Sequence, residues 1–184
     1  MKIPSLFLTL SAVALTAASA FGDTYSFSGS TGGALTFNRP TEPGDLLSDI
    51  GTEVPYYLQP FAVTLSGNYD FTLQPVDTSG YDSFLHLYSG AFDSSAPLVN
   101  FLAANDDAPG GGEYGSMLTG ISLTAGTTYF FVADGFGNSD AGAFNAQISG
   151  PGSINPVAVP EPVSGALAGL GVAAMLILRR RNAR

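Results

Sequence analysis

Short runs of the chain alternate aromatic or aliphatic residues with polar ones, and this alternation limits the possible folds more than any other feature. Phe61, Val63 and Leu65 occupy every second position of one run, and residues 69–73 repeat the pattern with Tyr, Phe and Leu. A period of two places such residues on one face of a β-strand, whereas a helix needs a period of 3.6. Ser66-Gly67-Asn68 lies between the runs and is typical of a hairpin turn. The region therefore predicts two antiparallel strands that share a buried face.

The same alternation recurs along the chain, broken by turns rich in Gly, Pro, Asn and Asp. Residues 21–150 show no convincing helical period, and many short strands of this kind are typical of an all-β, antiparallel β-sandwich, jelly-roll-like in form. Residues 38–54 are polar, so we expect a long connection there, and the prolines of residues 151–158 predict an extended linker. The expected strands are residues 24–28, 35–37, 57–65, 69–73, 83–88, 98–103, 117–123, 127–133 and 143–148.

The first twenty residues are organised like a secretory signal peptide. Lys2 precedes an apolar run over residues 3–20, which ends in Ala18-Ser19-Ala20, a small-residue pattern that signal peptidase cleaves. We expect cleavage after Ala20, or two residues later at the second small-residue pair, Ala20 and Gly22, and passage through the export machinery. The chain that follows is long enough for one domain with its own core, and we expect it to be exported.

Residues 159–184 contain three elements in a fixed order. Pro160-Glu161-Pro162 comes first, residues 163–178 are apolar, and Arg179-Arg180-Arg181 follows them. A helix over the apolar residues would be about 24 Å long, slightly shorter than a hydrocarbon core of about 30 Å, so we expect a transmembrane helix. Arginines beside a spanning segment stay on the cytoplasmic side, which places the preceding domain outside.

This tail resembles the PEP-CTERM sorting signal of bacterial envelope proteins. In that family a Pro-Glu-Pro sequence, a transmembrane stretch and a terminal arginine cluster direct processing by exosortase, a membrane enzyme that cuts near the tripeptide. The resemblance implies that the chain is anchored transiently in the cytoplasmic membrane and then released or transferred to the cell envelope or the exterior. Such tails usually accompany exopolysaccharide systems, which makes exopolysaccharide a candidate partner. The alternative is an ordinary C-terminal membrane anchor.

Charge is distributed very unevenly along the chain. Of the 15 acidic residues all except Glu161 lie between the two terminal signals, and of the six basic residues only Arg39 does. So acidic a surface does not suit nucleic acid or anionic lipid, because contacts with phosphate need Lys and Arg. A divalent cation or a cationic partner suits it better, and solubility alone is the simpler alternative. The absence of cysteine excludes disulfides and thiol chemistry.

A second resemblance covers residues 82–149. An aromatic strand at residues 82–88, the Asn105-Asp106-Asp107 turn, a hairpin around Ala125-Gly126-Thr127 and a closing strand from Gly142 follow the order of the bacterial pre-peptidase C-terminal domain. That domain is a small β-sandwich accessory module appended to secreted proteases and other surface proteins. The resemblance implies the same all-β fold, although no peptidase domain is evident in this sequence.

Carboxylate and amide groups gather around one of these turns. Calcium takes 6–8 oxygen ligands in flexible geometry, and the Gly-rich stretch after Asn105-Asp106-Asp107 offers oxygens of this kind. The alternative is that Asn and Asp form turns by bonding to their own backbone. Residues 134–140 make a weaker loop of the same type, and neither loop has EF-hand spacing. The predicted calcium ligands are Asp82, Asn105, Asp106, Asp107 and Glu113.

His86 is the only histidine, and it lies between Leu85 and Leu87 in an expected strand. Alternation places it on the face opposite those leucines, where a packed or surface ring is a simpler interpretation than a catalytic base. The chain also lacks the Gly-x-Ser-x-Gly elbow of many serine hydrolases. We therefore predict a non-enzymatic surface or matrix protein. The alternatives are a carbohydrate- or protein-binding module, marked by an exposed aromatic strip on one sheet face, and a hydrolase, marked by carboxylates converging in a cleft.

Overall fold

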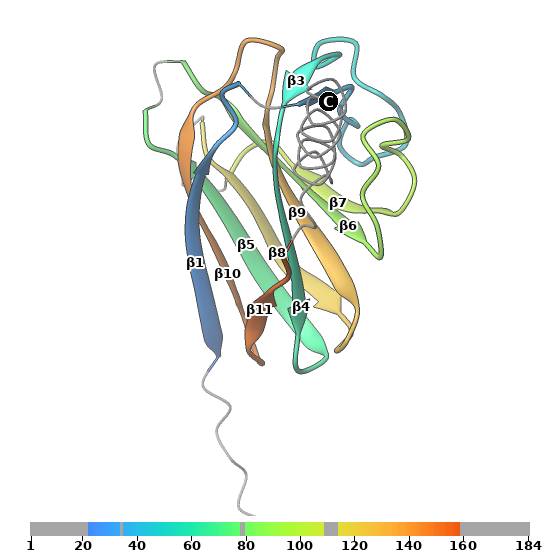
Figure 1. Ribbon diagram of the computed structural model, residues 1–184, viewed down its shortest axis with the longest axis vertical. Coiled ribbons are helices and arrows are strands. Elements are labelled where there is room, and N and C mark those ends of the chain that lie inside the picture. Colours follow the sequence, from blue (N-terminus) through green and yellow to red (C-terminus); the bar gives the residue numbers. More distant parts are fainter. Residues whose placement is uncertain (1–21, 34, 78–79, 109–113, 159–184) are drawn as a thin grey trace, which may run out of the picture.

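The structure, a computed structural model, describes residues 22–33, 35–77, 80–108 and 114–158 (Figure 1). They form a four-stranded sheet of order β1-β10-β5-β8, a five-stranded sheet of order β11-β4-β9-β6-β7, and the small pair β2-β3. All strand pairs are antiparallel and no helix occurs in the described residues, so the all-β, antiparallel prediction is confirmed. The strands are β1 (Asp23–Ser30), β2 (Thr36–Phe37), β3 (Val54–Pro55), β4 (Tyr57–Val63), β5 (Gly67–Pro75), β6 (Ser83–Ser89), β7 (Phe101–Asn105), β8 (Ser116–Leu123), β9 (Thr128–Gly135), β10 (Ala143–Gly150) and β11 (Ile154–Pro156).

The two large sheets face each other across the main hydrophobic core (Figure 1). Phe71 of β5 and Phe144 of β10 enter it from the four-stranded sheet, and Phe61 of β4 and Phe131 of β9 enter it from the five-stranded sheet. The Phe71 ring centroid lies 5.9 Å from that of Phe61 and 6.4 Å from that of Phe131, a spacing at which aromatic rings attract. The period-two alternation produces this core, because every second side chain of each strand points to the same side.

The outer face of the five-stranded sheet is also buried. Residues 38–53, which connect β2 to β3, pass over this face, and we call them the covering segment (Figure 1). Phe37 and Val54, at its two ends, pack with Tyr88 of β6 and Val132 of β9 in a second hydrophobic cluster. β6 is therefore buried along nearly its whole length, as expected for a strand covered on both faces. The described residues thus contain two buried hydrophobic clusters, one between the sheets and one beneath the covering segment.

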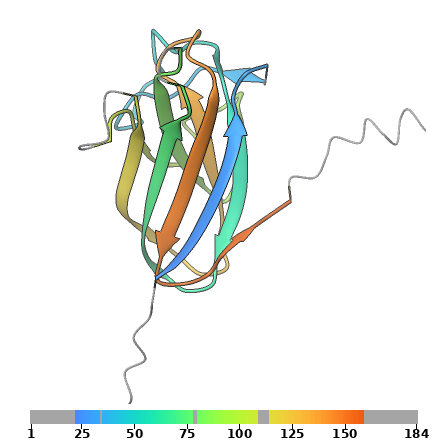
Figure 2. The ribbon, with the colours of Figure 1, turned by 90° about the vertical axis from the view of Figure 1, so that its left-hand side faces the viewer.

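The outer face of the four-stranded sheet is open. β10 alternates strictly between exposed and buried side chains from Ala143 to Ile148, which is the pattern of a sheet with one solvated face. Figure 2 shows this sheet face on, and no described segment of the chain crosses in front of it. The two sheets therefore differ in what lies outside them, a loop layer in one case and solvent in the other.

Several strand bounds differ from those expected, and the structure explains three of the differences. β4 ends at Val63, so Leu65 lies in the turn before β5 and is 51% exposed. β7 begins at Phe101 instead of Leu98, because Asn100 has a left-handed φ of 62° that interrupts an extended chain. Residues 154–156 are not a free linker: they form β11 beside β4, because the buried side chain of Ile154 packs on the main core.

The terminal assignments fall outside the described residues. This applies to the signal peptide at residues 1–20, to the sorting signal at residues 159–184, and to the transmembrane segment 163–178 within it. In the ranges that the structure does describe, no helix has the length and the hydropathy to cross a membrane. Both terminal signals stay predictions from the sequence.

Candidate functional site

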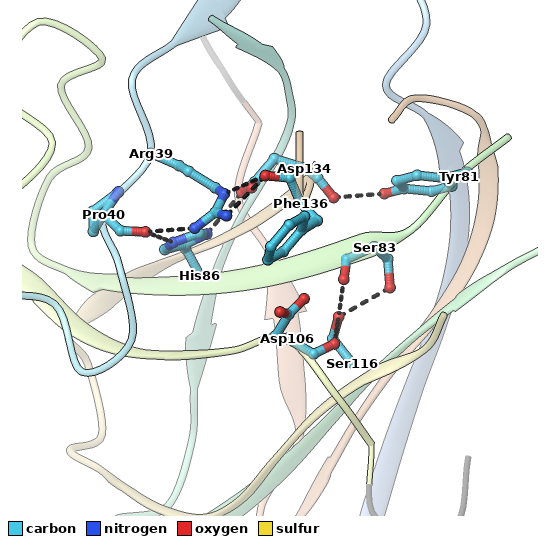
Figure 3. Close-up of polar contacts among 9 residues, drawn as sticks. All are labelled: Arg39, Pro40, Tyr81, Ser83, His86, Asp106, Ser116, Asp134 and Phe136. Carbon is cyan, nitrogen blue, oxygen red and sulfur yellow. Dashed lines mark hydrogen bonds and ion pairs between the residues drawn. The ribbon is translucent and has the colours of Figure 1, made fainter. Parts of the chain in front are cut away.

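Three ionisable side chains meet beneath the covering segment, on the outer face of the five-stranded sheet (Figure 3). His86 comes from the middle of β6, Asp134 from the end of β9, and Arg39 from the covering segment itself. His86 lies opposite the core-facing Leu85 and Leu87, as the alternation predicts. Both His86 and Asp134 are completely buried, and Arg39 is only 3% exposed. We call these three residues the buried cluster.

The hydrogen bonds of His86 determine where its ring protons lie. Nε2 is 3.1 Å from the carbonyl oxygen of Pro40, and because a carbonyl only accepts, Nε2 carries a proton and donates it. Nδ1 is 2.8 Å from Asp134 Oδ2, with one proton between them. An ionised Asp134 accepts that proton from an imidazolium, and a protonated Asp134 donates it to a neutral imidazole. The pair has no net charge in either form, which reduces the free-energy cost of burying it.

Two observations at Asp134 favour its protonated form. Burial raises the pKa of Asp134, and attraction to His86 and Arg39 only opposes this rise. The second carboxyl oxygen, Oδ1, is buried and has no hydrogen-bond partner among the described residues. An unpaired buried oxygen costs less free energy on a neutral carboxyl than on a carboxylate.

Arg39 fastens the covering segment to the end of β9. Its Nε and Nη2 donate to the carbonyl oxygen of Phe136 at 3.0 and 2.8 Å, and its Nη1 donates to that of Pro40 at 3.2 Å. The guanidinium carbon is 4.2 Å from the Phe84 ring centroid and 5.1 Å from that of Phe136, within cation–π range. Burial lowers the pKa of Arg39, and nearby carboxylates, Asp134 foremost, oppose this. Sequence reasoning missed this role, although Arg39 is the only cation between the terminal signals.

A hollow of about 360 Å³ opens beside the buried cluster, and we call it the acidic hollow. Burial raises the pKa of Asp106 to about 6, with further rises from Asp82 and Asp107, while Arg39 opposes the shift. Asp106 Oδ1 is buried without a hydrogen-bond partner among the described residues. The hollow thus combines a carboxyl that is readily protonated with other carboxylates and a stacked arginine. The residues that matter for its chemistry are Arg39, Glu42, Asp49, Phe84, Asp106 and Phe136.

The predicted calcium ligands come together only in part. Asp82 and Asp107 lie close enough to Asp106 to affect its ionisation. Asn105 Oδ1 instead accepts a hydrogen bond from a backbone N–H of β8 at 3.1 Å. Glu113 lies outside the described residues. Within the described ranges no group of three or more His, Asp or Glu side chains is arranged to hold a metal ion, and calcium at this edge stays a prediction.

The weaker candidate loop, residues 134–140, uses its side-chain oxygens for local structure. Asp140 Oδ2 accepts from the backbone N–H of Gly137 at 2.7 Å. Asn138 Oδ1 accepts from the backbone N–H of Glu53 at 2.8 Å, which joins this loop to the covering segment. The alternative interpretation of such loops, that Asn and Asp form turns and brace the backbone, accounts for these contacts.

The buried cluster is suited to holding structure together and not to catalysis. A general base must reach the proton that it abstracts, yet His86 exposes no surface and both of its ring nitrogens are already engaged. Its bond to Pro40 and the bonds of Arg39 join the covering segment to β6 and β9. The acidic hollow, in contrast, is open to solvent.

Comparison with known proteins leaves the family of this chain open. No protein-family model matches the chain, and no curated protein matches its sequence. Its function must therefore be inferred from the motifs of the sequence together with the geometry of the two sheets.

Proposed function

We propose that the chain is an exported, non-enzymatic β-sandwich protein of the cell envelope or extracellular matrix, jelly-roll-like in form, which exosortase processes near Pro160-Glu161-Pro162. The observation that carries the proposal is the order of the tail elements directly after a folded domain. Near the end of the described residues, Val157 N–H donates to the Pro60 carbonyl oxygen, and only two residues separate Val157 from the tripeptide. The tail itself lies outside the described residues, so this part of the proposal rests on the sequence.

The non-enzymatic part of the proposal is supported by the buried cluster. The only histidine of the chain is sealed beneath the covering segment and serves to fasten that segment. The strands that carry the resemblance to the pre-peptidase C-terminal domain, β6 to β10, contribute to both sheets. An accessory or surface role requires only a stable exported domain of this kind.

The test of processing is mass spectrometry of the protein recovered from a host that contains exosortase. We expect a mature chain that begins after Ala20 and ends near residues 159–163. Replacing Arg179, Arg180 and Arg181 together with Ala should impair processing, because it removes the cytoplasmic stop. The matched control replaces the same three residues with Lys, which keeps the charge and should keep the stop. A mature protein that still contained Arg184 would identify an ordinary membrane anchor instead.

The acidic hollow favours a second candidate function, a secreted hydrolase that acts on glycosides. Such enzymes use one carboxylic acid with a raised pKa and a second, ionised carboxylate. Asp106, with its pKa of about 6, supplies the first property, and Glu42 and Asp49 line the same hollow. A screen of the exported protein against chromogenic glycosides, with Asp106→Asn beside the unmodified chain, decides between the two functions. Turnover that disappears in Asp106→Asn would establish the hydrolase and overturn the non-enzymatic proposal.

A further inference from the structure

The open face of the four-stranded sheet carries hydroxyl and amide side chains in regular rows. They point outward because the alternate residues, such as Phe27, Ala146 and Leu73, point toward the core. β1 contributes serine and threonine, β10 contributes asparagine, glutamine and serine, and β5 contributes threonine and glutamine. Figure 2 shows how these three strands lie side by side. We call this surface the neutral face. Its central side chains are Ser26, Ser28, Thr72, Gln74, Asn145 and Gln147.

The strand register aligns these side chains across the sheet. Ser26 pairs with Gln147, which pairs with Thr72 on the other side, and the next row consists of Ser28, Asn145 and Gln74. Neighbouring strands lie about 4.8 Å apart, and side chains on one face repeat at about 7 Å along a strand. The result is a lattice of hydrogen-bonding groups at spacings that are comparable to the size of one sugar ring.

These groups are available for a ligand. Within the described residues, the only hydrogen bond between side chains of the neutral face joins Gln147 Nε2 to Ser26 Oγ at 3.3 Å. Together with Phe27 and Ala146, the central side chains line a shallow hollow of about 450 Å³. Amides and hydroxyls both donate and accept hydrogen bonds, so they match a ligand whose own groups are hydroxyls.

Charge restricts the class of ligand further. The region between the terminal signals has fourteen carboxylates and one arginine, yet no carboxylate lines the central hollow of this face. Asp70 lies at its margin, where Oδ1 accepts a hydrogen bond from Gly120 N–H at 2.7 Å. A polyanion is repelled by the net negative charge, and a polycation is drawn to the acidic side of the molecule instead. An uncharged ligand is neither repelled from this face nor drawn away from it.

From the lattice, the hollow and the charge distribution we propose that the neutral face binds an uncharged, hydroxyl-rich polymer, namely a neutral polysaccharide. Among the described residues this face lacks the exposed aromatic strip expected of a typical carbohydrate-binding module, because Tyr25 and Phe27 are partly buried against the core. The polymer is therefore held by hydrogen bonds and not by stacking on rings. Each such bond contributes little net free energy, since water competes for it, and binding depends on many repeats along one chain. This inference concerns the folded domain and does not depend on how the tail is processed.

The test is native affinity electrophoresis of the full chain in mild detergent, through gels containing dextran, mixed-linkage β-glucan or the polyanion alginate. We expect at least one neutral glucan to retard the chain and alginate not to do so. The variant Asn145→Asp with Gln147→Glu keeps the side-chain shapes but charges the face, and it should raise the dissociation constant about tenfold or more. The matched control is Gln59→Glu with Asn155→Asp on β4 and β11, which adds the same charge to the other sheet and should bind like the unmodified chain.

Each outcome has a definite meaning. Circular dichroism and thermal melting first establish that both double variants are folded, as expected for changes at surface positions. Retardation that is lost only in the neutral-face variant supports the proposal. No retardation by either glucan, equal loss in both variants, or stronger retardation by alginate would overturn it. So would sedimentation showing that the neutral face instead pairs two copies of the chain, a dimer that dissociates in the neutral-face variant.

Discussion

The two large sheets share one buried core but differ in their outer faces. Each buries an aromatic inner face in the shared core, but loops carry charged groups over the five-stranded sheet while the four-stranded sheet shows solvent a face of hydroxyls and amides. A covered sheet can hold ionisable groups such as Asp134 away from water, but each buried group then needs a well-placed partner. Leaving a sheet open requires neutral polar side chains that water and a ligand can both satisfy. We therefore expect substitutions beneath the covering segment to change the stability of the fold. Substitutions on the neutral face should instead change the proposed binding of a ligand.

The largest expected difference between the faces comes from Asp134→Ala. This change leaves His86 Nδ1 without a partner in a fully buried pair and opens a cavity beside it, so we expect it to cost about 3 kcal/mol. The comparison variant is Gln147→Ala on the neutral face, which we expect to change the free energy of unfolding by no more than about 0.5 kcal/mol. Chemical denaturation of residues 22–158 measures both. Similar values for the two variants would mean that the buried cluster does not stabilise the covered sheet.

Calcium should act on the covered side alone. If the ion binds near Asp106 and Asp107, it stabilises the folded state by about 2.7 kcal/mol at a concentration of 100 times the dissociation constant. Thermal melting in EDTA, in millimolar Ca²⁺ and in Mg²⁺ measures this, and Asp106→Ala with Asp107→Ala should abolish the calcium-dependent part. Asn145→Asp with Gln147→Glu should leave it unchanged. Equal melting temperatures in all three solutions would mean that the Asn105-Asp106-Asp107 segment forms a turn and does not bind calcium.

The covered side should also respond to pH. The folded-state pKa of Asp106 is raised to about 6, above its unfolded value, so its favourable contribution is complete below about pH 4 and is lost as the pH rises through 6. Because water screens a half-exposed carboxyl, we expect an effect of about 1 kcal/mol. Melting curves from pH 4 to 7.5 should show this loss in the unmodified chain and a weaker one in Asp106→Asn. A variant with the same pH profile as the unmodified chain would contradict the assignment.

The smallest expected effect compares two buried tyrosine hydroxyls. That of Tyr81 donates to the Asp134 carbonyl oxygen at 3.1 Å, whereas that of Tyr88 is buried without a partner among the described residues. Tyr81→Phe should therefore destabilise by about 1 kcal/mol, and Tyr88→Phe should be neutral or slightly stabilising. Denaturation midpoints resolve a difference of this size. Destabilisation by Tyr88→Phe equal to that by Tyr81→Phe would show that the Tyr88 hydroxyl has a partner after all.

Much of the sheet structure could be predicted from local alternation. The faces of Phe71 and Leu85 follow from a period of two, and so does the position of His86 opposite the core. Alternation reports only which side chains share a face, however, and not what lies above that face. Residues 38–54 were recognisable as a long connection, but their polar composition gave no sign that they would fold back over β6.

The candidate site was harder to predict because it depends on contacts far apart in the sequence. Arg39 meets Phe136 across 97 residues, and His86 meets Asp134 across 48. No spacing motif marks such a pair, although a single cation among fourteen carboxylates was a usable signal for Arg39. The neutral face was visible in the sequence as Ser, Thr, Asn and Gln at alternate positions, but only the strand register shows that they form rows.

The edge strand β11 limits how much free chain a processing enzyme could reach at the Pro-Glu-Pro sequence. Val157 is held by its bond to Pro60, and the three residues from there to Pro160 span no more than about 11 Å, so a processing enzyme would meet the folded domain at close range. β11 has only three residues and pairs on one side, so it can open locally without unfolding the sheets. Such opening would lengthen the accessible chain by about 10 Å or more, so if the proposed processing requires this extra length, the frequency of opening limits the rate of cleavage.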